Sequence, residues 1–435
     1  YLEDHGRKFY AWKEFLHICI YPCAFRYHKK KGNKAILAPF ELGQLQVSKN
    51  NFQKISDEEL AWIAQYEIIY FNNSISISAL KTKARAYFDY YCSLLAVEEI
   101  EGFISSGDSR IYIRSAILAC QKLGIPVAYF EQGPYGTTII DFKGVNANLS
   151  FAGKGPKIIN QAKQVTLVNT SADPKPSPDK YYSKQKKKKS EIISTMITLV
   201  LMYMPIHSRA FLPIELKQGS IKSLFNSRIR KWLVDPMMKL FQQSSSHHLF
   251  INDYILLLLQ MPNDAQTVLH SRCYGDIRTL VSDIVLACPE GLNVIVREHP
   301  FYRGQYDSWL YSFIDKLSHR VVLDLDSKYE NLIKNASIVA TLNSTGGIDA
   351  LRLGKTVVTL GDAYYSDIDA VYSVKARYEL PQILRSAVLE PRDPLLIKSY
   401  FIWLMNNLIA GHYTDEALLN ASSVIQAINS CWANA

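Results

Sequence analysis

Residues 337–361 read SIVATLNSTGGIDALRLGKTVVTLG, and this stretch decides the fold. Its outer parts, 337–344 and 355–361, are short apolar runs rich in β-branched residues, which indicates buried strands. Between them, GGIDALRLG at 346–354 has the apolar spacing of a helix. A strand, a helix and a strand joined so closely predict a parallel βαβ unit.

The same alternation extends toward the N-terminus. Strand-like and helix-like runs follow one another with short joints: YILLLLQ (254–260), RTLVSDIVLAC (278–288), NVIVREHP (293–300), WLYSFIDKL (309–317), RVVLDLD (320–326) and KYENLIKNA (328–336). Repeated βα alternation predicts a doubly wound parallel sheet of the Rossmann type.

The first part of the chain contains a second such pattern. Residues 34–42 look like a short buried strand that runs into a turn, and residues 66–71 look like another strand. Residues 102–133 predict a strand, a helix over 110–124 that ends at Gly124, and a strand over 125–130. We therefore expect a second Rossmann-type domain.

A change of composition separates the two regions. Residues 171–190 (SADPKPSPDKYYSKQKKKKS) are too polar and too rich in proline to be buried, and 191–247 mixes basic and large apolar residues. We expect an α/β protein with a Rossmann-like domain at 1–170, a basic linker and helical insertion at 171–248, a second Rossmann-like domain at 249–384, and C-terminal helices at 385–435 that pack across the domains.

Composition narrows the class of protein. Nearly half of the 435 residues are hydrophobic, which excludes global disorder, and the net charge of +9 suits an anionic ligand, a membrane surface or nucleic acid. Seven scattered cysteines without a CxxC pair favour a reducing compartment. No secretion signal is visible, and the apolar run at 192–204 is shorter than the roughly 20 residues of a membrane span. We expect a cytoplasmic protein.

Polar clusters follow several of the predicted strands, where ligands of parallel sheets bind. In the second domain they are Gln260, Asp264 and Gln266 after the first strand, Arg297 and His299 after the second, and Asn343, Ser344, Thr345 and Gly346 between a strand and a helix. In the first domain they are Glu131 and Gln132, followed by a Gly-Pro turn. These are our candidate site residues.

Each cluster has a chemical and a structural interpretation. Asp264 is a candidate nucleophile or a helix N-cap, and Glu131 a candidate general acid or base or a salt-bridge partner. His299 can donate a hydrogen bond to a phosphate, or it can be a purely structural histidine. Ser344 and its neighbours form a phosphate cradle or simply cap the helix.

The DxD sequence at 324–326 has the form of a metal site. An N-cap role for Asp326 or Ser327 is sufficient explanation, so we expect neither a metal nor another cofactor.

The ordered set FEQGP, IIDFKGVN, LLLQMPNDAQ, VREHP and TLNSTGGIDALRLGKTVVTLG resembles the capsule-polysaccharide-type transferases that add β-linked Kdo, an acidic eight-carbon sugar. The similarity covers roughly residues 100–150 and 250–365. Members of that family are GT-B-like, with two Rossmann-type domains. They take CMP-β-Kdo and retain the anomeric configuration through a sugar–aspartate intermediate.

Carried over by position, this resemblance assigns roles to the candidate residues. Asp264 is similar to the aspartate nucleophile, and His299 and Ser344 would hold the CMP phosphate, with Asn343 and Thr345 nearby. Glu131 and Gln132 would lie near the sugar or the acceptor hydroxyl. Arg297 would neutralise the phosphate or the sugar carboxylate, or else form a salt bridge.

The resemblance leaves other readings open. Pseudaminic acid and related nine-carbon sugars are also supplied as CMP donors with the same charged groups. An epimerase, an inverting transferase that uses a UDP-sugar, or a non-catalytic glycan-binding export component would share the fold. The acceptor would be a capsule, O-antigen or other lipopolysaccharide glycan.

A run of lysines at 184 and 186–189 beside two tyrosines suggests contact with anionic lipid, and a solvated loop is the alternative. An anionic inner-membrane surface is therefore a further candidate partner. We expect no nucleic acid partner.

Overall fold

The computed structural model describes residues 15–44, 54–72, 74–156, 211–213, 253–324, 327–411 and 421–434. These residues divide into two compact units. The first unit contains the described residues up to Phe142, residues 211–213 and the residues from Ile409 onward. The second unit contains residues 143–156 and 253–408. Most of the predicted insertion at 171–248 lies outside the described residues.

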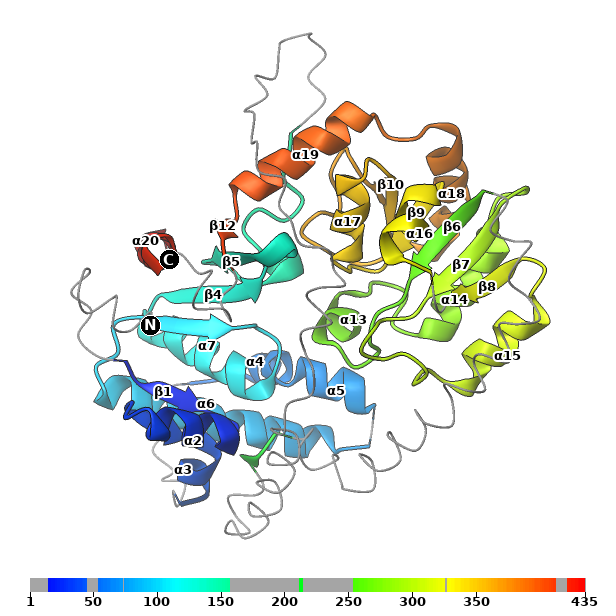
Figure 1. The fold of residues 1–435 in the computed structure, drawn as a ribbon. Helices are drawn as coiled ribbons and strands as arrows, with labels where there is room; N and C mark the ends of the chain where they lie inside the picture. The colour runs from blue at the N-terminus through cyan, green and yellow to red at the C-terminus, as the bar shows by residue number, and fades with distance from the viewer. Residues whose placement is uncertain are drawn as a thin grey trace. The chain divides into compact units, whose positions relative to one another are not determined.

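The second unit is built on a six-stranded parallel sheet (Figure 1). Its strands are β6 (Tyr254–Leu258), β7 (Asn293–Arg297), β8 (Val321–Asp324), β9 (Ile338–Thr341), β10 (Thr356–Thr359) and β11 (Tyr372–Ser373). In space they run β11-β10-β9-β6-β7-β8. This is the doubly wound order, in which the winding direction reverses between β6 and β9.

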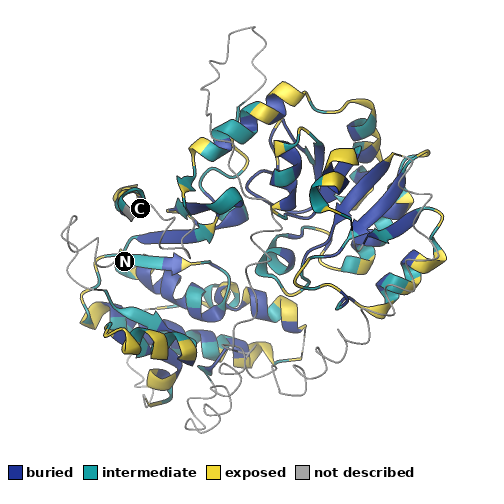
Figure 2. Cartoon of the chain, in the orientation of Figure 1, coloured by how far each residue is buried: buried dark blue, intermediate teal, exposed yellow. Residues whose placement is uncertain are grey.

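Helices cover both faces of this sheet, as the predicted alternation requires. They are α13 (Ala265–His270), α14 (Ile277–Ala287), α15 (Ser308–Lys316), α16 (Tyr329–Asn335), α17 (Gly346–Arg352), α18 (Leu380–Leu389) and α19 (Pro394–Asn406). Alternate residues of β6, such as Ile255 and Leu257, share one core with α14, α15 and α18. Leu258 points to the other face, toward α17. The central strands are therefore buried on both sides (Figure 2).

The first unit contains a four-stranded sheet in the order β12-β5-β4-β3. Strand β3 (Phe103–Ser106), helix α7 (Ile111–Leu123) and strand β4 (Val127–Gln132) form the predicted parallel βαβ unit. Gly124 ends α7 with a left-handed φ of 69°, as the sequence predicts. Strand β5 (Thr137–Asp141) then pairs antiparallel with β4. The unit thus adds an antiparallel pair to its parallel core.

The remaining elements of the first unit are a parallel strand pair and several helices. They are β1 (His17–Cys19), β2 (Ala35–Leu37), α2 (Pro22–Lys30), α3 (Ala38–Gln44), α4 (Asp57–Ile63), α5 (Gln65–Phe71), α6 (Ile77–Val97) and α20 (Ala421–Asn434). The strand that we predicted at 66–71 is wrong, because these residues form α5. Ile63, Tyr66, Glu67 and Phe71 are buried at helical spacing, and Glu67 accepts a hydrogen bond from Ile111 N–H at 3.1 Å.

The chain changes unit at places that the sequence does not mark. Within the second unit, the loop that follows Phe142 packs against Tyr364: Asn146 accepts from its N–H at 3.4 Å, and Gly153 donates to its carbonyl at 3.1 Å.

The predicted C-terminal tail is divided in the same way, because α19 belongs to the second unit. Residues 409–410, predicted as helix, instead form the short strand β12 on β5, and α20 packs on Ala128 and Phe130. Among the described residues, no helix is both long and apolar enough to cross a membrane.

Candidate functional site

The site begins at the reversal point of the second unit, between the carboxyl ends of β6 and β9. Gln260 follows β6 and Asn343 follows β9, and both are buried. The Asn343 backbone N–H donates to Gln260 Oε1 at 3.0 Å, which joins the two strand ends. Ligands of doubly wound sheets bind at this reversal point, so the predicted clusters lie at the expected edge.

Asp264 lies just beyond β6, at the N-cap of α13. Its Oδ1 accepts a hydrogen bond from the Gln266 backbone N–H at 3.3 Å, so the structural interpretation of this residue is observed. The carboxylate is only partly buried. Capping engages one oxygen and is compatible with chemistry at the other.

His299 lies beyond β7, the neighbour of β6 in the sheet. Its Nδ1 accepts from the Phe301 backbone N–H at 3.3 Å, so a neutral ring carries its proton on Nε2. Burial lowers the pKa of His299, and the charge of Asp264 raises it in part. The neutral ring therefore offers an Nε2–H donor, and its residue follows the strand next to the one that Asp264 follows.

Two residues that the sequence analysis missed hold the His299 loop. Tyr306 is buried, donates to the Gln260 carbonyl at 3.1 Å and accepts from His299 N–H at 3.2 Å. Glu298 is buried and accepts from Tyr311 Oη at 2.7 Å and Gly304 N–H at 3.1 Å. Burial raises the pKa of Glu298. Tyr306 gives no local signal, because its partners come from two different strand ends.

Ser344 is the turn between β9 and α17. Its Oγ accepts from Gly346 N–H at 3.1 Å, so its side chain binds the first N–H of α17 as predicted, although the N-cap position itself is held by Thr345. Its carbonyl accepts from Gly347 N–H at 2.9 Å and from the buried Tyr365 hydroxyl. Thr345 is exposed and makes no side-chain capping bond. The hydrogen bond from Tyr365 therefore fixes the backbone of this turn.

Gly346 leaves no room for a side chain. A Cβ atom there would lie 2.5 Å from Leu258 Cδ1 and 2.6 Å from Tyr329 Oη. We expect Gly346→Ala to destabilise the protein by about 1–3 kcal/mol, because a packed core resists an added carbon. Urea unfolding measures this, with Gly275→Ala as control, since a Cβ there meets Ser271 Oγ at 3.4 Å. Equal stability of the two variants would contradict the packing argument.

Two buried oxygens at the reversal point accept no hydrogen bond from the described residues. They are Asn343 Oδ1 and Gln266 Oε1. The Asn343 amide nitrogen donates to the Gln266 and His270 carbonyls at 3.0 and 3.3 Å, which sets the orientation of the amide. Leaving a buried acceptor unsatisfied costs about 1–3 kcal/mol. The pair thus suits a ligand or water that offers hydrogen-bond donors.

Arg297 makes the salt bridge that was the alternative to donor binding. Its guanidinium pairs with the buried carboxylate of Asp324, which also accepts from Ser327 N–H at 3.3 Å. Asp324 therefore serves the fold, and Asp326 lies outside the described residues. Helix α16 has Lys328 as its N-cap, so the predicted N-cap role of Ser327 is wrong. A role for Arg297 in donor binding stays a prediction.

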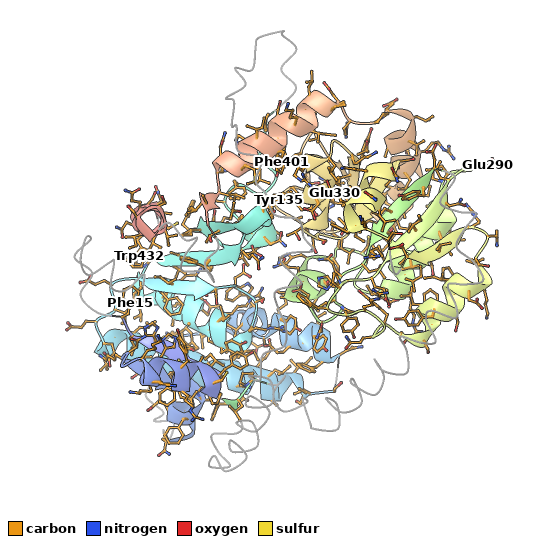
Figure 3. The ribbon with its side chains drawn as sticks, in the orientation of Figure 1. Phe15, Tyr135, Glu290, Glu330, Phe401 and Trp432 are labelled. Carbon is orange, nitrogen blue, oxygen red and sulfur yellow. The ribbon has the colours of Figure 1, made fainter. Side chains whose placement is uncertain are left out.

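Glu131 and Gln132 belong to the first unit, where β4 continues through both. Glu131 is partly buried opposite Ile139, and Gln132 is exposed. The predicted turn follows: Gly133 N–H donates to the Thr137 carbonyl at 2.9 Å, with Tyr135 at its tip (Figure 3). The role of Glu131 opposite Asp264 stays a prediction.

Comparison with known proteins agrees with the resemblance found in the sequence. Protein FixF of Sinorhizobium fredii (strain NBRC 101917 / NGR234) is 33% identical over 179 residues, 40% of this chain and 42% of FixF. The capsule polysaccharide export protein KpsS of Escherichia coli is 31% identical over 123 residues, 26% of this chain and 31% of KpsS. The chain thus spans less than half the length of these relatives.

A solved structure and a family model extend the comparison. The β Kdo 2,7 transferase structure of Thermosulfurimonas dismutans KpsC covers 91% of this chain and 99% of its own, at 12% identity and a TM-score of 0.36. The family model described as capsule polysaccharide biosynthesis protein matches residues 101–369, more than half of the chain. The protein therefore belongs to the capsule polysaccharide biosynthesis protein family.

Proposed function

We propose that the protein is a retaining glycosyltransferase that moves Kdo from CMP-β-Kdo to a surface-polysaccharide acceptor. The observation that carries the proposal is the placement of Asp264 and His299 just beyond the carboxyl ends of the adjacent strands β6 and β7, with His299 Nδ1 accepting from Phe301 N–H so that Nε2 is left to donate. A retaining displacement on a CMP-sugar needs a carboxylate nucleophile and a hydrogen-bond donor that stabilises the leaving phosphate. Family membership supports a role in polysaccharide synthesis.

The reaction would run in two displacements. An Asp264 oxygen attacks the anomeric carbon, the bond from that carbon to the phosphate oxygen breaks, and CMP leaves with the electron pair. His299 Nε2–H and the Ser344 turn would hold the leaving phosphate. An acceptor hydroxyl then attacks the same carbon, which releases Asp264 as a carboxylate. Glu131 would take the hydroxyl proton. No metal or other cofactor is needed in this scheme.

The test is incubation of the protein with CMP-Kdo, followed by CMP measurement and intact-protein mass spectrometry. Release of CMP with a mass increase of one sugar is the expected result. Release from CMP-pseudaminic acid alone would change the donor, and turnover of a UDP-sugar alone would replace the mechanism. Binding of glycan without turnover of any donor would point to a non-catalytic export component.

We also propose that the lysine run at 184 and 186–189 draws the enzyme to anionic lipid, where a lipid-linked acceptor would be found. Each basic residue near such a surface contributes about 1 kcal/mol. Replacing the five lysines by glutamine should therefore weaken sedimentation with anionic liposomes and leave the small binding to neutral liposomes unchanged. Unaltered sedimentation with anionic liposomes would remove the run from membrane binding.

A further inference from the structure

Helix α13 is too short to be stable without contacts to the rest of the unit. It has six residues, with Asp264 at its N-cap and Arg272 two residues beyond its end. Isolated helices of this length are unstable in water, so external contacts must set the direction of the helix. Because an N-cap residue moves with its helix, the same contacts set the position of Asp264.

Two carbonyls of α13, those of Gln266 and His270, are bound by loops that follow β9 and β10. Asn343 Nδ2 donates to the Gln266 and His270 carbonyls, and Asp362 N–H donates to the His270 carbonyl at 2.7 Å. Gly361 allows this approach, because a Cβ atom there would lie 2.6 Å from the His270 carbonyl oxygen. The loops after two strands thus hold α13 at its second and at its last residue.

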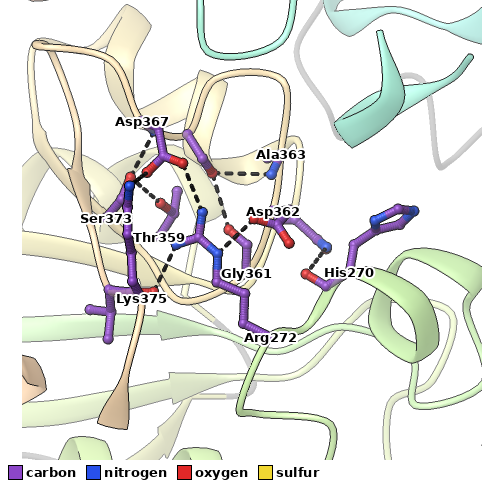
Figure 4. A network of polar contacts seen from close by, with 12 residues as sticks. His270, Arg272, Thr359, Gly361, Asp362, Ala363, Asp367, Ser373 and Lys375 are labelled. Atoms are coloured by element: carbon purple, nitrogen blue, oxygen red, sulfur yellow. Dashed lines mark hydrogen bonds and ion pairs between the residues drawn. The ribbon is translucent and has the colours of Figure 1, made fainter. Parts of the chain in front are cut away.

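Arg272, just beyond the end of the helix, binds the segments that follow β10 (Figure 4). Its side chain is largely buried and donates to Asp362 Oδ1 at 2.6 Å, the Val374 carbonyl at 2.8 Å and Asp367 Oδ2 at 3.1 Å. Both Arg272 and Asp367 have left-handed backbones, with φ of 51° and 59°. Such conformations outside glycine cost about 1–3 kcal/mol and persist where the surroundings impose them.

We propose that Arg272, Asn343, Asp362 and Asp367 form a clamp, the α13 clamp, whose function is to position Asp264 for attack on the sugar donor. The side chain of Arg272 is engaged by Asp362, Asp367 and the Val374 carbonyl and would act through α13, so it is a positioning residue. The inference rests on the proposed function for its meaning, whereas the contacts of the clamp with α13 do not depend on it. A displacement of about 1 Å in a reacting group can cost about a hundredfold in rate.

The first arm of the test measures CMP release by Arg272→Ala and Arg272→Lys. We expect kcat to fall about 10- to 100-fold in Arg272→Ala with KM within about threefold, because donor contacts remain while the nucleophile moves. Arg272→Lys should recover only part of the rate, since one ammonium cannot serve three diverging acceptors. Arg377→Ala is the control, since it breaks a bidentate pair with Asp283 at 2.7 and 2.9 Å outside the clamp.

The second arm needs no turnover. Because the Asp264 charge raises the pKa of His299, Asp264→Asn should lower the pKa measured by NMR titration of the ring. Arg272→Ala should lower it as well, whereas Arg377→Ala should not. Gly361→Ala offers a check that removes no polar partner, because it pushes on the His270 carbonyl directly.

The outcomes separate the two proposals. A wild-type enzyme that turns over no CMP-sugar ends the proposed function, while the titration still decides whether the clamp places Asp264 beside His299. An unchanged kcat or an unchanged His299 pKa in a folded Arg272→Ala variant overturns the clamp. An unchanged pKa in Asp264→Asn also overturns it, because the two groups would then not be neighbours.

Discussion

Asp264→Asn is expected to slow CMP release from CMP-Kdo by at least about a thousandfold and to abolish the sugar adduct. The amide is nearly the same size as the carboxylate but is a far weaker nucleophile, so donor binding should persist while the first displacement stops. Single-turnover CMP release and intact-protein mass spectrometry measure the two effects. Near-normal release would exclude the covalent mechanism.

A matched variant separates chemistry from helix capping. Asp276 is the N-cap of α14 and accepts from the Arg278 and Thr279 backbone N–H groups at 3.3 and 3.1 Å. Loss of an N-cap costs about 0.5–2 kcal/mol, and asparagine replaces aspartate well at this position. Asp276→Asn should therefore change neither stability nor CMP release by much. If it slowed release as much as Asp264→Asn, capping rather than nucleophilic attack would explain both.

His299→Ala is expected to lower kcat for CMP release by about 10²- to 10³-fold, the usual loss for one donor that stabilises developing charge. The Nε2–H is available because Nδ1 already accepts from Phe301 N–H. His319 is exposed in the same unit, so His319→Ala is the control and should keep wild-type activity. Equal rates of the His299→Ala variant and wild type would remove His299 from the leaving-group contact.

The pH dependence distinguishes the two forms of the His299 ring. Its pKa lies below the ordinary value of 6.5, so the ring is neutral at about pH 7 and above. If the neutral ring is the hydrogen-bond donor, titration of His299 should not change the rate of single-turnover CMP release between about pH 7 and 8. A requirement for the imidazolium would instead make the rate rise as the pH drops through the lowered pKa.

Several features of the candidate site could be predicted from the sequence, because they depend on local pattern. Strand-ending polar residues such as Asp264, His299 and Asn343 lie at the carboxyl edge, since the direction of a parallel strand is set by the chain itself. The capping bonds of Asp264 and Ser344 follow from residue type and spacing alone. Their structural interpretations were also visible in the sequence and are observed, whereas their chemical roles stay predictions.

Residues that act through distant partners could not be predicted. Arg272 looks like an ordinary loop residue, and its acceptors lie 90 to 102 positions away. Tyr306 likewise binds Gln260, 46 positions away, and so joins the loop that it shares with His299 to the end of β6. Arg297 was placed in the donor site by resemblance, whereas its observed partner is Asp324, reached only when β7 lies beside β8.

The sequence by itself determined the α/β class, the alternation of strands and helices from Tyr254 to Thr359, and the edge of the sheet where polar side chains gather. Periodicity and capping depend only on residues that are close in sequence, so they can be predicted without knowledge of the tertiary contacts. Tertiary structure alone decided that 66–71 is a helix, that β12 joins β5, and that β6 lies beside β9. Those outcomes depend on which surfaces become buried together, and burial is a property of the whole packed unit rather than of any segment.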